Sequence, residues 1–126
     1  MKILLMIKIK RDVIERIKEF SFNAYPNEFG AMLSCTNEII DDLIFYPLSS
    51  NNQNSFSISE FQIPISMGSC GSVHSHPSSS NSPSNADLNF FSKRGKIHII
   101  ICYPFENENV IFYDRNGNVL DFEIVN

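Results

Sequence analysis

Residues 73–91 read Val-His-Ser-His-Pro-Ser-Ser-Ser-Asn-Ser-Pro-Ser-Asn-Ala-Asp-Leu-Asn-Phe-Phe, and this stretch carries strong structural signals. A Gly/Ser-rich strand is expected to end at Pro77, because proline has no N–H to donate to a sheet. A Ser/Asn/Pro loop over 78–83 follows. Ser84, with Asp87 three residues later, is typical of the capped start of a helix. The stretch therefore predicts a strand, a loop and a helix in immediate succession.

The rest of the chain predicts a mixed α/β arrangement with helices packed on one sheet. Apolar residues at helical spacing from Arg11 onward indicate another helix, which Pro26 ends, and the helix after Ser84 is expected to stop near Gly95. Asn116-Gly117 indicates a hairpin between the last two strands. Short apolar or alternating runs predict further strands over residues 3–9, 29–35, 39–47, 56–59, 97–103, 110–113 and 119–125.

Length and composition limit the class of protein. A chain of 126 residues has the size of one domain, which is expected to span residues 1–126. Hydrophobic residues make up 43% of the chain and charged residues 19%, so a globular core is expected. The net charge is −4, and no basic run is longer than Lys93-Arg94. Because binding to phosphates needs a basic stripe, nucleic acid is not an expected partner.

The sequence also suggests a compartment. The apolar run at residues 3–7 is shorter than the core of a signal peptide, and no segment is long enough to cross a bilayer. The three cysteines, Cys35, Cys70 and Cys102, are odd in number and widely spaced, which argues against a disulfide framework. We therefore expect a cytoplasmic protein with no membrane association.

His74 and His76 are the first candidates for chemistry. Residues two apart on a strand point to the same face, so the two imidazoles can bind one metal ion, and imidazole suits Zn²⁺. The alternative is a pair of strand histidines that make ordinary hydrogen bonds. Asp87 follows in the first turn of the helix and can reach back across the loop. Two histidines and one aspartate, with a fourth position for water, are typical of a catalytic zinc. The plainer interpretation is that Asp87 forms a capping box with Ser84. Asp87 can be a cap residue and a metal ligand at the same time.

A zinc hydrolase also needs a group that takes and returns a proton. Glu28 is the candidate, because it lies at a break before a buried apolar strand. The alternative interpretation is that Glu28 is a solvated turn residue, and the local sequence pattern does not distinguish these two interpretations. His98 lies inside an apolar strand and is expected to be a core or edge histidine rather than a ligand. Spacing excludes the metallo-β-lactamase, zinc-deaminase and His-Glu-x-x-His templates.

The string His74-Ser75-His76-Pro77, with Ser84 and Asp87 after it, resembles the His-x-His-x₇-Ser-x₂-Asp motif of the JAMM (MPN-positive, Mov34/MPN/PAD-1) zinc metalloproteases. Residues 25–30 look like the family segment that bears the catalytic glutamate, and residues 96–104 resemble the following strand of small archaeal members. The resemblance covers essentially the whole chain. It implies an α/β (α+β) fold with a cytidine-deaminase-like MPN core: a mixed, mostly antiparallel sheet of seven or eight strands flanked by two helices.

The same resemblance implies roles for the site residues. His74, His76 and Asp87 would be zinc ligands, Glu28 the acid/base, and Ser84 the group that stabilises the oxyanion. The expected function is a zinc-dependent isopeptidase or peptidase that removes diglycine-ended ubiquitin-like modifiers from conjugated proteins, which would be its partners. The alternatives are a peptidase that trims the C-terminus of a sulfur-carrier protein, and a non-catalytic MPN scaffold in a larger complex. The sequence does not indicate an oligomeric state.

Two segments are candidates for contact with an extended substrate. The polar loop over 49–55 is the part of the chain that could gate the site, and the segment over 56–63 beside it is the candidate edge for pairing with a modifier tail.

Overall fold

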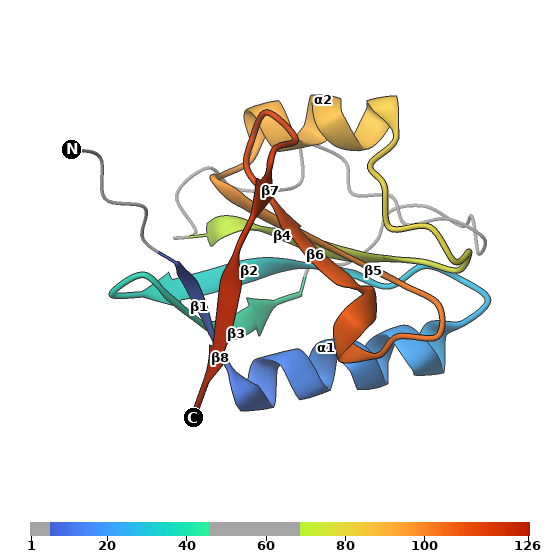
Figure 1. The fold of residues 1–126 in the computed structure, drawn as a ribbon, viewed down its shortest axis with the longest axis horizontal. Coiled ribbons are helices and arrows are strands. Elements are labelled where there is room, and N and C mark those ends of the chain that lie inside the picture. Colours follow the sequence, from blue (N-terminus) through green and yellow to red (C-terminus); the bar gives the residue numbers. More distant parts are fainter. Residues whose placement is uncertain (1–5, 46–68) are drawn as a thin grey trace.

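The computed structural model describes residues 6–45 and 69–126, and all structural statements concern these residues (Figure 1). The predicted strand over 56–59 and the two candidate substrate segments lie outside them. The described elements are β1 (Ile7–Lys10), α1 (Arg11–Ala24), β2 (Gly30–Thr36), β3 (Ile39–Ile44), β4 (Ser69–His76), α2 (Asn85–Lys93), β5 (Ile97–Cys102), the 3₁₀ turn Asn107–Asn109, β6 (Val110–Tyr113), β7 (Val119–Leu120) and β8 (Phe122–Val125). No helix among these is long and apolar enough to cross a membrane.

The strands form one mixed sheet in the order β7-β6-β5-β4-β2-β3-β1-β8. Three neighbouring pairs, β1–β3, β1–β8 and β4–β5, are parallel, and the other four are antiparallel. The hairpin predicted at Asn116-Gly117 joins β6 to β7, with Gly117 at a φ of 85° that favours glycine. The expected α/β fold, with a mixed and mostly antiparallel sheet and two helices, is confirmed.

The last predicted strand, over 119–125, is two strands instead of one. β7 pairs with β6 at one end of the strand order, and β8 pairs with β1 at the other. The chain passes from one to the other through the exposed Asp121, whose carbonyl accepts the N–H of Ile7. This crossing brings the two edges of the sheet toward each other. Periodicity could not reveal the division, because the apolar pattern runs through the break.

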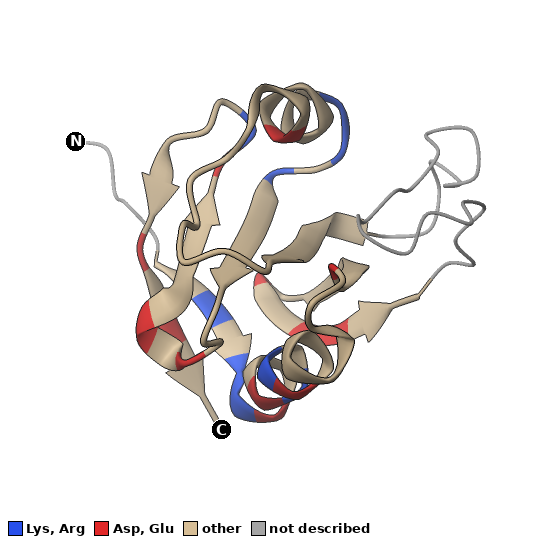
Figure 2. Ribbon diagram, turned by 90° about the vertical axis from the view of Figure 1, so that its right-hand side faces the viewer, with Lys and Arg blue, Asp and Glu red and all other residues tan. Residues whose placement is uncertain are grey.

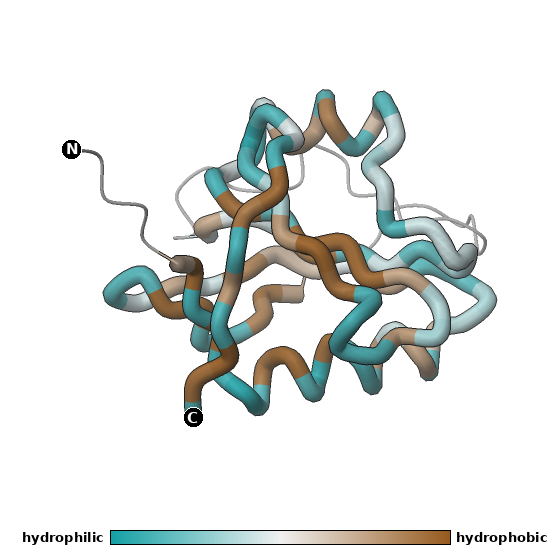
Figure 3. The backbone as a smooth tube through the Cα atoms, viewed as in Figure 1, coloured by the Kyte–Doolittle hydropathy of each residue, from teal (hydrophilic) through white to brown (hydrophobic). Residues whose placement is uncertain are grey.

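The two helices cover opposite faces of the sheet (Figure 1). α1 buries Val13, Ile14 and Ile17, which recur at helical spacing and join the main core. Charged residues of both signs lie between these positions in the first part of α1, as Figure 2 shows. α2 buries only Phe91, in a smaller cluster with Ile100 and Tyr113. Brown, hydrophobic segments run through the sheet between the helices in Figure 3.

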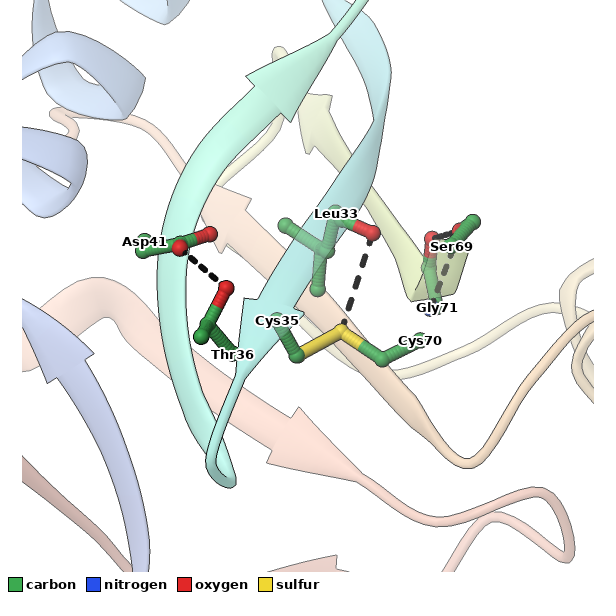
Figure 4. Close-up of a disulfide and its surroundings, with 7 residues drawn as sticks. All are labelled: Leu33, Cys35, Thr36, Asp41, Ser69, Cys70 and Gly71. Carbon is green, nitrogen blue, oxygen red and sulfur yellow. Dashed lines mark hydrogen bonds between the residues drawn. A yellow bond between two sulfur atoms is a disulfide. The ribbon is translucent and has the colours of Figure 1, made fainter. Parts of the chain in front are cut away.

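The cysteine prediction was wrong. Cys35 on β2 and Cys70 on β4 form a disulfide, with Cα atoms 5.9 Å apart (Figure 4). The strands are antiparallel neighbours, and a bulge sets Cys70 between the paired residues Ser69 and Gly71. The two cysteines are 35 residues apart in the chain, so only the pairing of β2 with β4 brings them together. The cysteine count therefore no longer supports a reducing compartment. Cys102 is free and buried.

Candidate metal centre

Three side chains converge where β4 ends and α2 begins. The Nε2 atoms of His74 and His76 lie 3.2 Å apart. Asp87 reaches back across the loop, with Oδ1 3.1 Å from His74 Nε2 and Oδ2 3.4 Å from His76 Nε2. One ligand atom from each residue lies within 4.8 Å of the others. The structure thus brings together the three residues that the sequence selected as candidate ligands.

The arrangement fits a zinc ion. With metal–ligand bonds of about 2.05 Å, ligand atoms around a tetrahedral zinc are about 3.3 Å apart. The closest separations in this structure, 3.1, 3.2 and 3.4 Å, are near that value, with Oδ1 of Asp87 facing His74 and Oδ2 facing His76. His76 Nδ1 lies 3.0 Å from the carbonyl of Ser80 and can donate to it. A neutral His76 with its proton on Nδ1 presents the lone pair of Nε2 to the centre, as a metal ligand requires.

The electrostatics of the cluster favour a charged carboxylate. Burial acts to raise the pKa of Asp87, but hydrogen bonds from His74 and His76 outweigh it and hold the pKa well below its usual range. The hydrogen bond with Asp87 raises the pKa of His76 against the effect of burial, and the charges of Asp87 and Glu28 add to the rise. The Asp87 carboxylate is therefore ionised at neutral pH, as a metal ligand must be.

The loop between the histidines and Asp87 is held by several backbone contacts. The N–H of Tyr103 lies within bonding distance of the carbonyls of His76 and Ser78, at 3.2 and 3.0 Å. The backbone carbonyl of Asn81 accepts a hydrogen bond from the hydroxyl of Tyr113 on β6. The side-chain amide of Asn81 donates to the backbone carbonyl of Asn109. These contacts could not be predicted from the sequence, because a backbone carbonyl that accepts a hydrogen bond has no residue signature.

Glu28 lies beside the centre. β2 pairs with β4 in a register that sets Gly30 opposite His74. The ladder continues for one more residue, since Ser75 N donates to Phe29 O at 2.8 Å. Continuing this register places Glu28 opposite His76, and the Glu28 side chain is half-buried there. Its charge also acts on the pKa of His76, as described above. This position favours the functional interpretation of Glu28 over that of a solvated turn residue.

Ser84 caps α2 and contacts Asp87 twice. Its Oγ accepts the N–H of Asp87 at 3.1 Å, and its own N–H donates to Asp87 Oδ2 at 2.8 Å. The capping box proposed from the sequence is therefore present. Because Oδ2 also faces His76, the cap and the cluster share one carboxylate.

The remaining candidates lie elsewhere. His98 is fully buried, bonded to Ser72 and Gly95, and stacked on Phe91, so its prediction as a core histidine is confirmed. The other acidic residues Glu106, Glu108 and Glu123 are exposed. Glu60 lies outside the described residues.

Comparison with known proteins identifies the family. A family model described as prokaryotic homologs of the JAB domain matches residues 10–116. The chain belongs to this JAB family. A solved structure described as a JAMM metalloprotease-like zinc site in the proteasome and signalosome is 36% identical to this JAB-family chain. Its TM-score is 0.78 over 97% of this chain and 100% of that one.

Two further relatives agree with this assignment. A JAB1/MPN domain protein from Archaeoglobus fulgidus is 39% identical, with a TM-score of 0.76 over 94% of this chain and 99% of that one. A Haloferax volcanii protein named "Probable metalloprotease" is 26% identical over 130 residues, which cover 95% of this chain and 80% of that protein. The resemblance to small archaeal JAMM proteins, and the fold it implied, are confirmed.

Proposed function

We propose that this JAB-family chain is a zinc-dependent isopeptidase or peptidase that releases diglycine-ended ubiquitin-like modifiers from conjugated proteins. One observation carries the proposal: the side chains of His74, His76 and Asp87 converge, and Glu28, two residues before β2, is near enough for its charge to act on His76. The ligands and a proton acceptor thus meet at one end of the sheet. The kinship with metalloprotease-like proteins supports this chemistry.

Each residue has a separate part in the proposed reaction. When bound, zinc supplies a Lewis acid for the scissile carbonyl and acidifies the attacking water. Glu28 accepts the proton of that water and returns it to the leaving amine. Ser84 keeps its hydroxyl proton as a donor while its Oγ accepts from Asp87, so it can stabilise the developing oxyanion. Asp87, fixed by the cap on α2, holds its carboxylate toward both histidines.

Access to the centre bears on the substrate class. A centre at the end of a strand suits an extended peptide that lies along the sheet and pairs with backbone. We expect this approach to be narrow enough that bulky side chains next to the scissile bond clash, so small residues are favoured there. A modifier tail that ends in Gly-Gly meets this demand.

The test uses zinc-loaded protein and a ubiquitin-like modifier joined through its diglycine end to a lysine side chain. Wild type should release the modifier, and a chelator should abolish release. Glu28→Gln keeps the size of the side chain but cannot take a proton, so turnover should fall by roughly 10²–10⁴-fold with zinc content unchanged. Near wild-type turnover in Glu28→Gln would contradict the assigned role. No cleavage by the wild type would favour a scaffold.

A second arm tests selectivity for the tail. Replacing the penultimate Gly of the modifier with Leu should lower kcat/KM by at least about tenfold, which corresponds to about 1.4 kcal/mol. Equal cleavage of both tails indicates a general peptidase. Cleavage of only a linear fusion to a sulfur-carrier protein indicates the trimming activity instead.

A further inference from the structure

Ser75 lies between His74 and His76 in the sequence, but it contacts the backbone of Phe29. Side chains alternate along a strand, so Ser75 points away from the face that His74 and His76 share. Its side chain is fully buried, with 0% exposure. Its Oγ accepts the N–H of Phe29 at 2.8 Å, while its own N–H donates to Phe29 O at 2.8 Å. Ser75 and Phe29 thus hold each other through two hydrogen bonds.

The hydrogen bond from the Phe29 N–H to the Ser75 hydroxyl also restrains Glu28, the residue before Phe29. The N–H of Phe29 is part of the peptide group between Glu28 and Phe29, so the Ser75 hydroxyl holds the peptide plane that immediately follows Glu28. In a regular ladder a backbone carbonyl would accept such an N–H. Here a side-chain oxygen accepts it, at the point where the chain enters β2.

The segment that carries Glu28 is also anchored at its other end. The ring of Tyr25 packs against Tyr103, with centroids 4.9 Å apart. Tyr103 in turn contacts the backbone of His76 through its N–H. Phe29 itself stacks on Phe20 of α1, with centroids 5.4 Å apart. Residues 25–29 are therefore held between two aromatic contacts, and the Ser75 hydroxyl fixes the peptide closest to the carboxylate.

We propose that Ser75 is a positioning residue: its buried hydroxyl holds the Glu28–Phe29 peptide so that the Glu28 carboxylate stays opposite His76 at the reach needed for proton transfer. The proposal rests on the proposed function, in which Glu28 is the acid/base. Proton transfer requires a heavy-atom separation of about 2.6–3.2 Å, so a small shift of this backbone lowers the rate. Ser75 is not assigned contact with substrate or metal.

The experiment compares Ser75→Ala with wild type and repeats the change in a Glu28→Gln background, with zinc-loaded protein and the diglycine conjugate. Ser75→Ala should lower kcat by roughly 10–100-fold and leave KM and zinc content unchanged. In the Glu28→Gln background the same change should alter the remaining turnover by less than about threefold, because the group that it positions is already disabled. Ser75→Thr keeps the hydroxyl and should restore most of kcat.

Two further measurements separate positioning from a general loss of stability. Ser72→Ala removes another buried hydroxyl of β4, one bonded to His98, and should leave kcat near that of the wild type below the unfolding transition. Hydrogen exchange at the Phe29 amide should accelerate in Ser75→Ala, because that N–H loses its acceptor. If Ser75→Ala does not fold, Ser75→Cys keeps the shape of the side chain, slightly enlarged, with a weaker acceptor and should show the same losses.

Several outcomes overturn the proposal. An equal fall in kcat in both backgrounds means that Ser75 acts through something other than Glu28. Loss of zinc means that it acts through the ligands. Unchanged kcat, or an unchanged exchange rate at Phe29, means that the hydroxyl positions nothing. By contrast, a wild type without activity refutes the proposed function itself, so the two failures are distinct.

Discussion

The Asp87 side chain belongs both to the cap of α2 and to the candidate metal centre. Oδ1 faces His74, while Oδ2 faces His76 and accepts the N–H of Ser84. The helix cap thus restricts the rotation of the carboxylate, and a group held in this way loses less entropy when it binds a metal. Ser84 completes the arrangement by accepting the N–H of Asp87.

A change at Ser84 tests its two roles together. Ser84→Ala should cost about 1 kcal/mol of stability through loss of the cap. It should also lower kcat by roughly 10²–10³-fold with KM little changed, because an oxyanion donor acts mainly in the transition state. Urea unfolding and steady-state kinetics measure the two effects. Ser92→Ala is the control, since the Ser92 hydroxyl donates within α2, to the carbonyl of Asn89. A loss of stability with unchanged kcat would remove Ser84 from the mechanism.

At the scale of elements, α2 is attached to the sheet through a buried histidine. The ring of Phe91 stacks on His98 with centroids 4.3 Å apart and planes at 11°. His98 Nδ1 lies 2.7 Å from Ser72 Oγ, and Nε2 lies 3.2 Å from the carbonyl of Gly95. A neutral imidazole satisfies both partners, with Nε2–H as donor and Nδ1 as acceptor. Burial lowers the pKa of His98 to about 4, against hydrogen bonds to backbone that act to raise it.

This pKa predicts a loss of stability in acid. Between about pH 6.5 and about pH 4 the unfolded chain binds a proton at His98 that the folded chain does not. The free energy of unfolding should therefore fall as pH decreases through this range, by up to about 3 kcal/mol for this one group. Urea unfolding of wild type and of His98→Gln at several pH values measures the difference. Glutamine offers a donor and an acceptor but does not titrate, so its pH dependence should be weaker. Equal pH dependence in the two proteins would assign the effect to other groups.

Across the whole molecule, the candidate metal centre and the main core are separate. The core consists of apolar residues of α1 and the sheet, including the fully buried Ile17, Leu33 and Phe112. The candidate ligands lie at one end of β4 and in the first turn of α2. The crossing from β7 to β8 and the Cys35–Cys70 disulfide tie the sheet together independently of any metal.

Metal removal should therefore weaken the fold without destroying it. Purified protein is expected to hold about one zinc ion per chain, and Asp87→Ala should lose most of it. Circular dichroism should still show folded secondary structure, because the apolar core remains. A chelator should lower the Tm of the wild type and leave that of Asp87→Ala unchanged, since a ligand stabilises only the state that binds it. Glu123→Ala, which removes an exposed carboxylate on β8, is the control. Full zinc retention in Asp87→Ala would contradict its role as a ligand.

The sequence by itself determined the features that depend on a few neighbouring residues. The apolar spacing from Val13 to Ile17 predicted α1, and the apolar run after Lys96 predicted β5. The two-residue spacing of His74 and His76 and the pair Ser84 and Asp87 predicted where candidate ligands and a cap would lie. Strand alternation, helix periodicity and capping act over two to four residues, so they are visible in the order of side chains.

Only the tertiary structure decided the features that depend on strand register. Glu28 could have been a solvated turn residue, but the register of β2 with β4, continued past Gly30 and Phe29, leads it toward His76. The same pairing joins Cys35 to Cys70 and brings Phe29 to Ser75, 46 residues away. Register is fixed by burial across the whole sheet, because a slip of one residue would turn every core side chain toward the opposite face. No local pattern contains that information, so the partner of each residue is settled only when all the strands pack together.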